Sequence, residues 1–489
     1  MSRQRKKKSR KRGKRMDDEL LTARLLRRHF DPLPLDEITV AERQFPYRVR
    51  ADLQLAVDRL FSTDTRVDYF AGVRKEYAHE GLDFPGLIVK DHSAAVAVAP
   101  QFEEVHIGDE QPVRCLKNGL WLLRQRKTPY AVLLAPAMRY GEAKGMKFQI
   151  ATPNDAAGRD IAQRFFEHLE ESVLKAQSYR GKILSLEEKA SYSGQSSGIL
   201  VHRLRTVERE QVVLPDATLQ LLERNVVQFV RRRPQLAAAR QATKKGVLFY
   251  GPPGTGKTHT IHYLAGSLPG HTTLIVTAEQ VGLLAEYMTL ARLLQPSLVV
   301  IEDVDLIARD RANMGSPCEE VLLNKLLNEM DGLKADADVL FVLTTNRPEA
   351  LEAALASRPG RVDQAIEFPL PDDPGRERLI RLYAGGATPA DDVVRGIVAR
   401  TQGVSAAFIK ELMRRSIQFH LERHDTPGIE LPDVRDALDE LLFRGGSLNR
   451  KLLGGCAIGE ADGDSDGDGN GDAETDVQKN APPQSRGCG

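Results

Sequence analysis

The segment Gly251–Thr258, GPPGTGKT, combines residue types that can bind a nucleoside triphosphate. Its glycines let backbone N–H groups turn towards phosphate oxygens, and a helix that begins directly after the loop adds partial positive charge. The lysine of such a loop reaches the β- and γ-phosphates, and the hydroxyl that follows can ligate Mg²⁺. We therefore predict an ATP site made by Gly251, Pro252, Pro253, Gly254, Thr255, Gly256, Lys257, Thr258 and His259.

Two acids, Glu302 and Asp303, end a buried apolar run that starts at Ser297. In a parallel sheet this carboxyl end lies beside the phosphate loop, where one carboxylate can hold hydrated Mg²⁺ and the next can orient the attacking water. By position we expect Glu302 to serve the metal together with Thr258, and Asp303 to position the water. A strand that merely ends in solvated acids is the plainer alternative.

The elements around these residues support one fold. Residues 246–250 read as a strand before the glycine loop, and Ile261, Leu264 and Ala265 recur at helical spacing after it. A third apolar run, Val339–Asn346, ends in an amide suited to the γ-phosphate or the attacking water. Strand, loop and helix in this order predict a parallel α/β sheet.

These motifs, followed by Arg358-Pro-Gly-Arg361-Val-Asp363, closely resemble those of the AAA ATPases over residues 212–445. The resemblance implies a P-loop parallel-sheet module with a C-terminal helical lid, assembled into a homo-oligomeric ring, most commonly a hexamer. It implies that Asn346 is sensor 1 and that Arg361 is an arginine finger for the neighbouring subunit. Thr401–Ala407 is similar to the sensor 2 segment, with Ala406 where glycine is usual, and lid helices are expected over 408–421 and 434–443.

Three features depart from the common family pattern. The acids stand in the order Glu-Asp and Gln364 replaces a second arginine, as in the branch that resembles the mitochondrial translocator of the Rieske protein. The membrane segment of that branch is absent, and the chain most resembles uncharacterised soluble bacterial members. The segment 277–296 lacks an aromatic-glycine loop, since its region between Thr277 and Ala291 offers Val281, Gly282, Leu283 and Leu284. At helical spacing we expect Tyr287 to pack in the core rather than to grip a threaded polypeptide.

An α+β domain of unassigned role is expected before the AAA module. We predict strands over 94–99, 119–123, 130–134 and 146–151, then a helix capped by Asn154 or Asp155. Its apolar stripe comprises Ala157, Ile161, Phe165, Leu169 and Val173. A further helix should start at Pro215-Asp216 and stop at Pro234, with Arg231–Arg233 complementing its dipole. The predicted organisation is a tail (1–16), the N-terminal domain (17–190), a linker and entry strand (191–211), the nucleotide domain (212–372), the lid (373–446) and an acidic Gly/Asp-rich tail (447–489).

Composition limits the class of protein. The chain has 489 residues, 41% of them hydrophobic, with 69 Lys and Arg against 68 Asp and Glu. Ten of the first sixteen residues are basic, so that tail either binds nucleic acid non-specifically or serves as a solvated extension. Four dispersed cysteines favour neither zinc nor disulfides, and no apolar run is long enough for a membrane span. The calcium-loop-like stretch from Asp464 lacks a glutamate at its twelfth position and reads as a solvated tail.

The sequence thus predicts a cytoplasmic, Mg²⁺-dependent ATPase that remodels a protein client, recognised by the N-terminal domain. A nucleic-acid-associated ATPase and a nucleotide-gated assembly scaffold are the alternatives. The sequence does not name the client.

Overall fold

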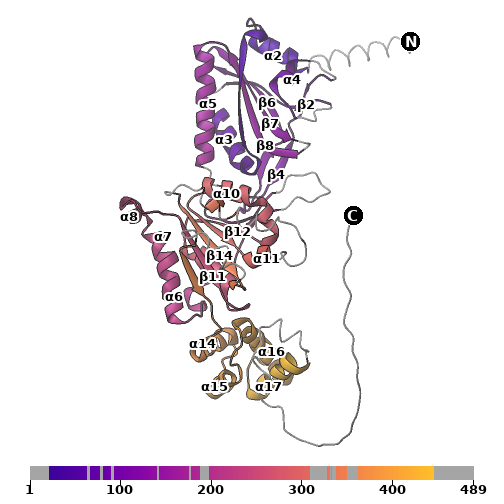
Figure 1. Ribbon diagram of the computed structural model, residues 1–489. Helices are drawn as coiled ribbons and strands as arrows, with labels where there is room; N and C mark the ends of the chain where they lie inside the picture. Colours follow the sequence, from indigo (N-terminus) through magenta and orange to yellow (C-terminus); the bar gives the residue numbers. More distant parts are fainter. Residues whose placement is uncertain are drawn as a thin grey trace, which may run out of the picture.

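The structure is a computed structural model that describes residues 21–62, 66–76, 81–89, 93–139, 142–175, 178–187, 198–308, 326, 328–330, 332, 337–349 and 362–444. Figure 1 shows three parts in succession: an N-terminal domain at the top, a central domain and a small helical lid at the bottom. The two predicted tails, Arg361 and the calcium-loop-like stretch lie outside the described residues.

The N-terminal domain is built on a six-stranded antiparallel sheet in the order β1-β8-β7-β6-β2-β3. Both faces of this sheet are covered, because side chains that alternate along its strands enter two different cores. Trp121 and Leu123 pack with helices α3 (Arg50–Ser62) and α5 (Ala156–Leu174). Leu120 and Leu122 pack with α2 (Thr22–Phe30) and α4 (Phe84–Ile88). Burial on both faces explains why the run 119–123 is apolar without alternation.

The elements of this domain agree with the expected α+β pattern, with small shifts at the ends. Asp155 caps helix α5 by accepting from the Gly158 backbone N–H, and Ala157 is exposed whereas the other four residues of the predicted stripe are buried. The bounds are α2 Thr22–Phe30, a short 3₁₀ turn Leu35–Glu37, β1 Ile38–Pro46, a second turn Tyr47–Val49, α3 Arg50–Ser62, β2 Arg66–Arg74, α4 Phe84–Ile88, β3 Val96–Val98, β4 Phe102–Val105, β5 Val113–Leu116, β6 Gly119–Gln125, β7 Thr128–Arg139, β8 Glu142–Pro153 and α5 Ala156–Leu174.

The central domain holds a seven-stranded sheet in the order β10-β9-β12-β13-β14-β11-β15, parallel except for β10. The carboxyl ends of β11, β13 and β14 therefore meet at one edge, as the sequence predicts. The bounds are β9 Ile183–Leu186, β10 Ile199–His202, α6 Asp216–Leu222, a π-helical continuation Glu223–Gln228, α7 Phe229–Arg231, α8 Arg233–Ala238, β11 Lys245–Tyr250, α9 Lys257–Ser267, β12 Thr272–Val276, a 3₁₀ segment Ala278–Leu283, α10 Leu284–Leu293, β13 Ser297–Ile301, α11 Val304–Ala308, β14 Val339–Thr345 and β15 Gln364–Glu367.

Strand β9 corrects the predicted domain boundary at residue 190. It pairs with β12 of the central sheet, in parallel, and with β10, in the antiparallel sense. Its side chains Leu184 and Leu186 are fully buried, so the strand adds to the core of the central domain as well as to its sheet. The same apolar cluster continues into the N-terminal domain through Val49 and Ile107, which couples the two domains.

The expected stop at Pro234 is wrong in one respect. Helix α7 ends at Arg231, but Pro234 lies in the first turn of another helix, α8, where its missing N–H is tolerated. Arg233 does not simply face a helix terminus: it is 5% exposed and forms an ion pair with Asp338 at the start of β14.

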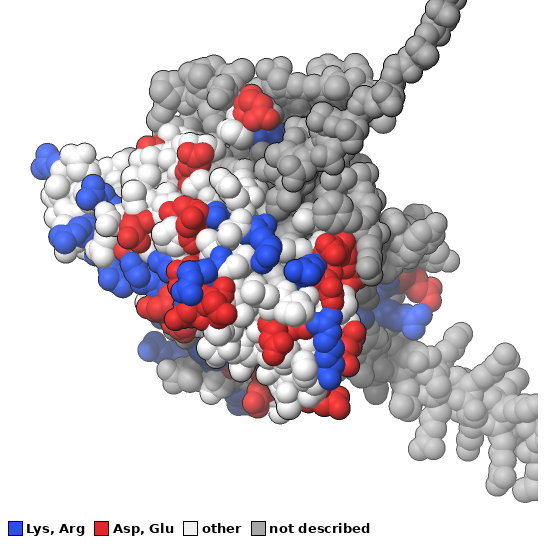
Figure 2. Space-filling model, turned by 90° about the horizontal axis from the view of Figure 1, so that it is seen from below, with Lys and Arg blue, Asp and Glu red and all other residues white. Residues whose placement is uncertain are grey.

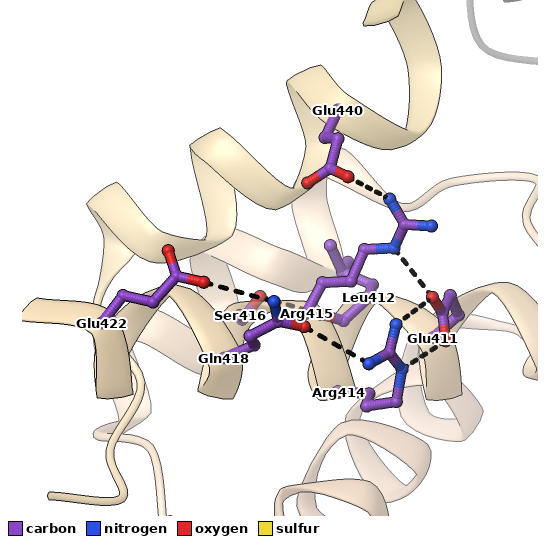
Figure 3. Close-up of polar contacts among 8 residues, drawn as sticks. All are labelled: Glu411, Leu412, Arg414, Arg415, Ser416, Gln418, Glu422 and Glu440. Atoms are coloured by element: carbon purple, nitrogen blue, oxygen red, sulfur yellow. Dashed lines mark hydrogen bonds and ion pairs between the residues drawn. The ribbon is translucent and has the colours of Figure 1, made fainter. Parts of the chain in front are cut away.

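The lid contains four helices, among them both that the sequence predicts: α14 Asp373–Ala384, α15 Asp391–Arg400, α16 Ala406–His424 and α17 Leu431–Asp439, continued by a π-helical turn Glu440–Arg444. Figure 3 shows polar contacts within α16 and one that joins α16 to the turn after α17. Glu411 accepts from Arg414 and Arg415, and Arg415 reaches Glu440 at 2.9 Å. The hydrogen bond from Arg414 lowers the pKa of Glu411 to about 2.

On the face of the lid seen in Figure 2, basic and acidic side chains are interspersed among the described residues. The close contacts of Figure 3 give one reason, because both arginines there have acidic partners. In the described ranges, no helix is both long and apolar enough to cross a membrane.

Candidate functional site

The glycine loop lies between β11 and α9, and its backbone conformation requires glycine. Gly251, Gly254 and Gly256 have φ values of 142°, 77° and 100°, in the region that L side chains rarely adopt. A Cβ atom at Gly251 would come within 2.3 Å of the Phe368 carbonyl oxygen. The loop can therefore keep this shape against the neighbouring chain only without a side chain at Gly251.

Lys257 opens helix α9 and folds back over the loop. Its side chain is 7% exposed, and Nζ donates to the carbonyl oxygens of Gly251 (2.7 Å) and Pro252 (2.9 Å). Burial lowers the pKa of Lys257 to about 8, partly opposed by the carboxylates of Asp303 and Asp305. A phosphate group near this ammonium would replace weak carbonyl partners by a full negative charge.

The two acids after β13 have different partners. The Thr258 hydroxyl donates to Glu302 Oε1 at 3.0 Å, so the two predicted metal ligands lie side by side. Asn346 Nδ2 donates to Asp303 Oδ1 at 3.1 Å. Asp303 also has a positive φ of 50°, a strained conformation for a non-glycine residue that recurs at functional sites.

Asp305 is a site residue to which the sequence assigned no role. Its buried carboxylate, 3% exposed, accepts from the Thr345 hydroxyl (2.8 Å) and from the Asn346 backbone N–H (3.1 Å). These bonds fix the end of β14 and with it the position of the Asn346 side chain. The signal in the sequence was a third acid two residues after Asp303.

A cavity of about 380 Å³ lies over the glycine loop, within the range of small-ligand sites. One wall carries the predicted catalytic groups Asp303 and Asn346, and the lid forms another wall. Lys410 of α16 is a basic residue of this wall that sequence reasoning missed, although it follows the sensor-2-like segment by one turn. The remaining lining comprises Gln211, Val212, Val213, Leu214, residues 253–260, Thr344, Leu379, Tyr383, Ala406 and Ala407.

The lid contacts the loop directly at the sensor-2-like segment. The Ala407 backbone N–H donates to the Gly254 carbonyl oxygen at 3.0 Å, and a Cβ at Gly254 would come within 2.9 Å of Ser405 Oγ. On the other side, Arg378 of α14 donates to the Leu214 carbonyl oxygen at 2.9 Å. His259 Nε2 lies 3.2 Å from the Gln211 carbonyl oxygen. The lid is thus hydrogen-bonded both to the glycine loop and to the segment before α6.

Tyr287 is buried in the central core, as the sequence predicts, with no exposed surface. Its hydroxyl lies 2.7 Å from Gln280 Oε1 and 2.9 Å from the Ile275 carbonyl oxygen, and it accepts from the Leu186 backbone N–H at 2.8 Å. Val281 and Leu284 are buried as well.

The comparisons with known proteins agree with this geometry. Residues 247–370 match the model of the ATPase family associated with various cellular activities, AAA. The chain carries an AAA ATPase domain. The family and the named relatives support ATP hydrolysis as the chemistry of this domain.

Three relatives show how far the similarity of the chain extends. The chain is 31% identical over 271 residues to the proteasome-activating nucleotidase of Methanothermobacter thermautotrophicus, covering 53% of this chain and 62% of that protein. It is 32% identical over 249 residues to the ATP-dependent zinc metalloprotease FtsH 3 of Synechocystis, covering 48% and 40%. It is 33% identical over 187 residues to the 26S proteasome regulatory subunit 10B of Dictyostelium discoideum, covering 36% and 47%. The chain thus spans from about two fifths to three fifths of the length of these relatives.

Proposed function

We propose that this AAA ATPase hydrolyses ATP with Mg²⁺ and couples the hydrolysis to remodelling or disassembly of a protein client. The observation that carries the chemistry is the convergence of two hydrogen-bonded pairs, Thr258 with Glu302 and Asp303 with Asn346, beside Lys257. Names of relatives that act with proteasomes or as proteases support protein remodelling in general terms.

The residues that line the cavity, together with Glu302 beside Thr258, fit both ATP and Mg²⁺. The left-handed glycines and the start of α9 present N–H groups to phosphates. A hydroxyl and a carboxylate 3.0 Å apart are the oxygen donors that Mg²⁺ prefers, and the bound ion would neutralise charge on the phosphates. In this proposal Lys257 binds the phosphates, Thr258 and Glu302 hold the ion, and Asp303 orients the attacking water. Asn346 fixes Asp303 and contacts the γ-phosphate side.

A ring-shaped homo-oligomer, most simply a hexamer, follows from the proposed use of Arg361 in the neighbouring site. Arginine fingers contribute roughly 10³–10⁵ in rate. Arg361→Ala should therefore bind ATP and hydrolyse it poorly. Mixing this variant with Lys257→Ala should restore activity, because one interface then combines an intact loop with an intact arginine. A wild-type rate per chain that does not change on dilution to monomers would exclude the arrangement.

We propose that the N-terminal domain binds the client and that its conformation responds to the nucleotide state through its contact with the central domain. Lys182 at the start of β9 donates to the Ile107 carbonyl oxygen at 2.6 Å and pairs with Asp109 at 2.7 Å. Ser178 donates its backbone N–H to Asp52 at 3.1 Å. Since β9 pairs with β12 of the sheet that carries the site, a shift of the sheet would be transmitted to this domain through these contacts.

The proposed role can be tested with a variant that binds ATP but does not hydrolyse it and therefore retains its client. Asp303→Asn should bind ATP without turnover and retain the client in an ATP-dependent complex, whereas Lys257→Ala, which does not bind ATP, should retain none. Captured proteins that are the same with both variants, or nucleic acid captured instead of protein, would reject protein remodelling. A cytoplasmic location is also our proposal, which fractionation of cells can check.

A further inference from the structure

We propose that His420, His424 and Glu430 form a binding site for a zinc-type transition-metal ion in the lid, apart from the nucleotide cavity. One ligand atom from each of these side chains lies within 4.8 Å of the other two. The two histidines are four residues apart on α16 and so occupy one face of the helix. Glu430 stands directly before α17, so a bound ion would join the end of α16 to the start of α17.

The first ligand, His420, is already oriented by a buried carboxylate. Its Nδ1 lies 2.8 Å from Asp433 Oδ2, and Asp433 is 1% exposed. A proton on Nδ1 shared with this carboxylate leaves the lone pair of a neutral ring on Nε2, which is the usual arrangement of a metal-binding histidine. Among the described residues none makes a hydrogen bond to Nε2 of His420.

Gly428, in the connection between α16 and α17, lies against the ring of His420. A Cβ atom at this position would lie 2.3 Å from His420 Nε2, 2.7 Å from Cδ2 and 2.9 Å from Cε1, which is over the face of the imidazole. Any other residue here would therefore clash with the ring. Glycine at this position lets the connection pack against His420 in the orientation that the bond to Asp433 fixes.

The charges around the three ligands favour a dication. Asp433 accepts from the Glu430 backbone N–H at 2.9 Å and pairs with Arg423, which also pairs with Asp436. Two carboxylates, those of Asp433 and Asp436, thus pair with one guanidinium, and the carboxylate of Glu430 adds a third negative charge to this region. Two imidazoles and one carboxylate suit zinc and its neighbours in the first transition row better than Mg²⁺ or Ca²⁺, and they leave a fourth position for water.

The test compares metal binding by the full chain and its variants in excess Mg²⁺, after all transition metal has been removed. Zn²⁺ is titrated against a chromophoric chelator, and the rate of amide hydrogen exchange is measured over residues 420–433. The variants are His424→Ala and Glu430→Gln, whose side chains are exposed. The matched control is His168→Ala, which removes an exposed helical histidine of α5. Circular dichroism verifies that each variant folds.

We expect the wild type and His168→Ala to bind one more tight Zn²⁺ per chain than the two lid variants. Loss of a supporting residue weakens metal binding by about 10–100-fold, so loss of a ligand should weaken it at least that much. Zn²⁺ should slow exchange over residues 420–433 in the wild type and the control alone. Equal Zn²⁺ affinity in wild type and both lid variants, or exchange unaffected by Zn²⁺ in the wild type, would overturn the proposal, whatever the ATPase activity.

Discussion

Replacing Tyr287 by phenylalanine tests whether this residue belongs to the core or grips a threaded polypeptide. The substitution keeps the aromatic ring and removes only the hydroxyl. In the core that hydroxyl accepts from the Leu186 N–H at 2.8 Å and can donate to Gln280 or Ile275. A residue that grips a polypeptide through its ring would be little affected by this change.

The size of the effect follows from burial. Tyr287 has no exposed surface, and Leu186 has none either, so water cannot replace the lost hydroxyl without opening the core. A buried polar group left without its partner costs about 1–3 kcal/mol. We therefore expect Tyr287→Phe to lower the free energy of unfolding of the central domain by about 2 kcal/mol. The ring still fills its space, so no cavity contribution is added.

The assay is urea-dependent hydrogen exchange of peptides from β9 and β12, which reports the central domain rather than the whole chain. Tyr263→Phe is the control, because Tyr263 lies in the same domain and its hydroxyl makes no hydrogen bond with a described residue. Equal stability of Tyr287→Phe and wild type would refute the core assignment. The core assignment would also be refuted if Tyr287→Ala abolished ATP-dependent unfolding of the client while Tyr287→Phe kept both this activity and the stability of the wild type.

Three further predictions concern the nucleotide cavity. Because burial lowers the pKa of Lys257 to about 8, the lysine is partly neutral above that pH, and the negative charge of ATP should restore its proton. ATP should thus bind more weakly at pH 9 than at pH 7 and take up protons at pH 8.5, as calorimetry in buffers of different ionisation enthalpy can measure; proton uptake of zero would contradict the pKa. Gly251→Ala should destabilise the nucleotide-free protein more than Gly256→Ala in thermal unfolding, since only the former places Cβ against a neighbour, the Phe368 carbonyl oxygen. Lys410→Ala should raise the Kd for ATP and leave the thermal stability of the nucleotide-free protein unchanged; an unaltered Kd would remove Lys410 from the site.

Much of the site could be predicted from the sequence because its signals are local. The glycine loop needs particular residues at consecutive positions, and the acids follow a strand whose apolar run marks it. Helix α5 was predictable from a four-residue repeat and a capping aspartate. Each of these patterns depends on neighbours within about one helical turn or one strand.

The features that the sequence did not predict depend on contacts between distant segments. Strand β9 joins the central sheet by pairing with β12, about 90 residues away, and nothing in its four residues indicates which sheet it enters. Arg233 looked like part of a basic run, yet it is buried and pairs with Asp338. Lys410 reaches the cavity only because the lid folds over the glycine loop. The sequence contains these residues, but it does not show which distant residues they contact.

The most direct test of the central claim is to measure ATP affinity and single-turnover hydrolysis for Asp303→Asn, with Lys257→Ala and Glu302→Gln alongside. If Asp303 orients the attacking water, Asp303→Asn should bind ATP as the wild type does and hydrolyse it at least about 100-fold more slowly, the usual contribution of a positioned base. Lys257→Ala should lose tight binding. Wild-type turnover by Asp303→Asn would contradict the account, and if Glu302→Gln alone abolished turnover the roles of the two acids would be reversed.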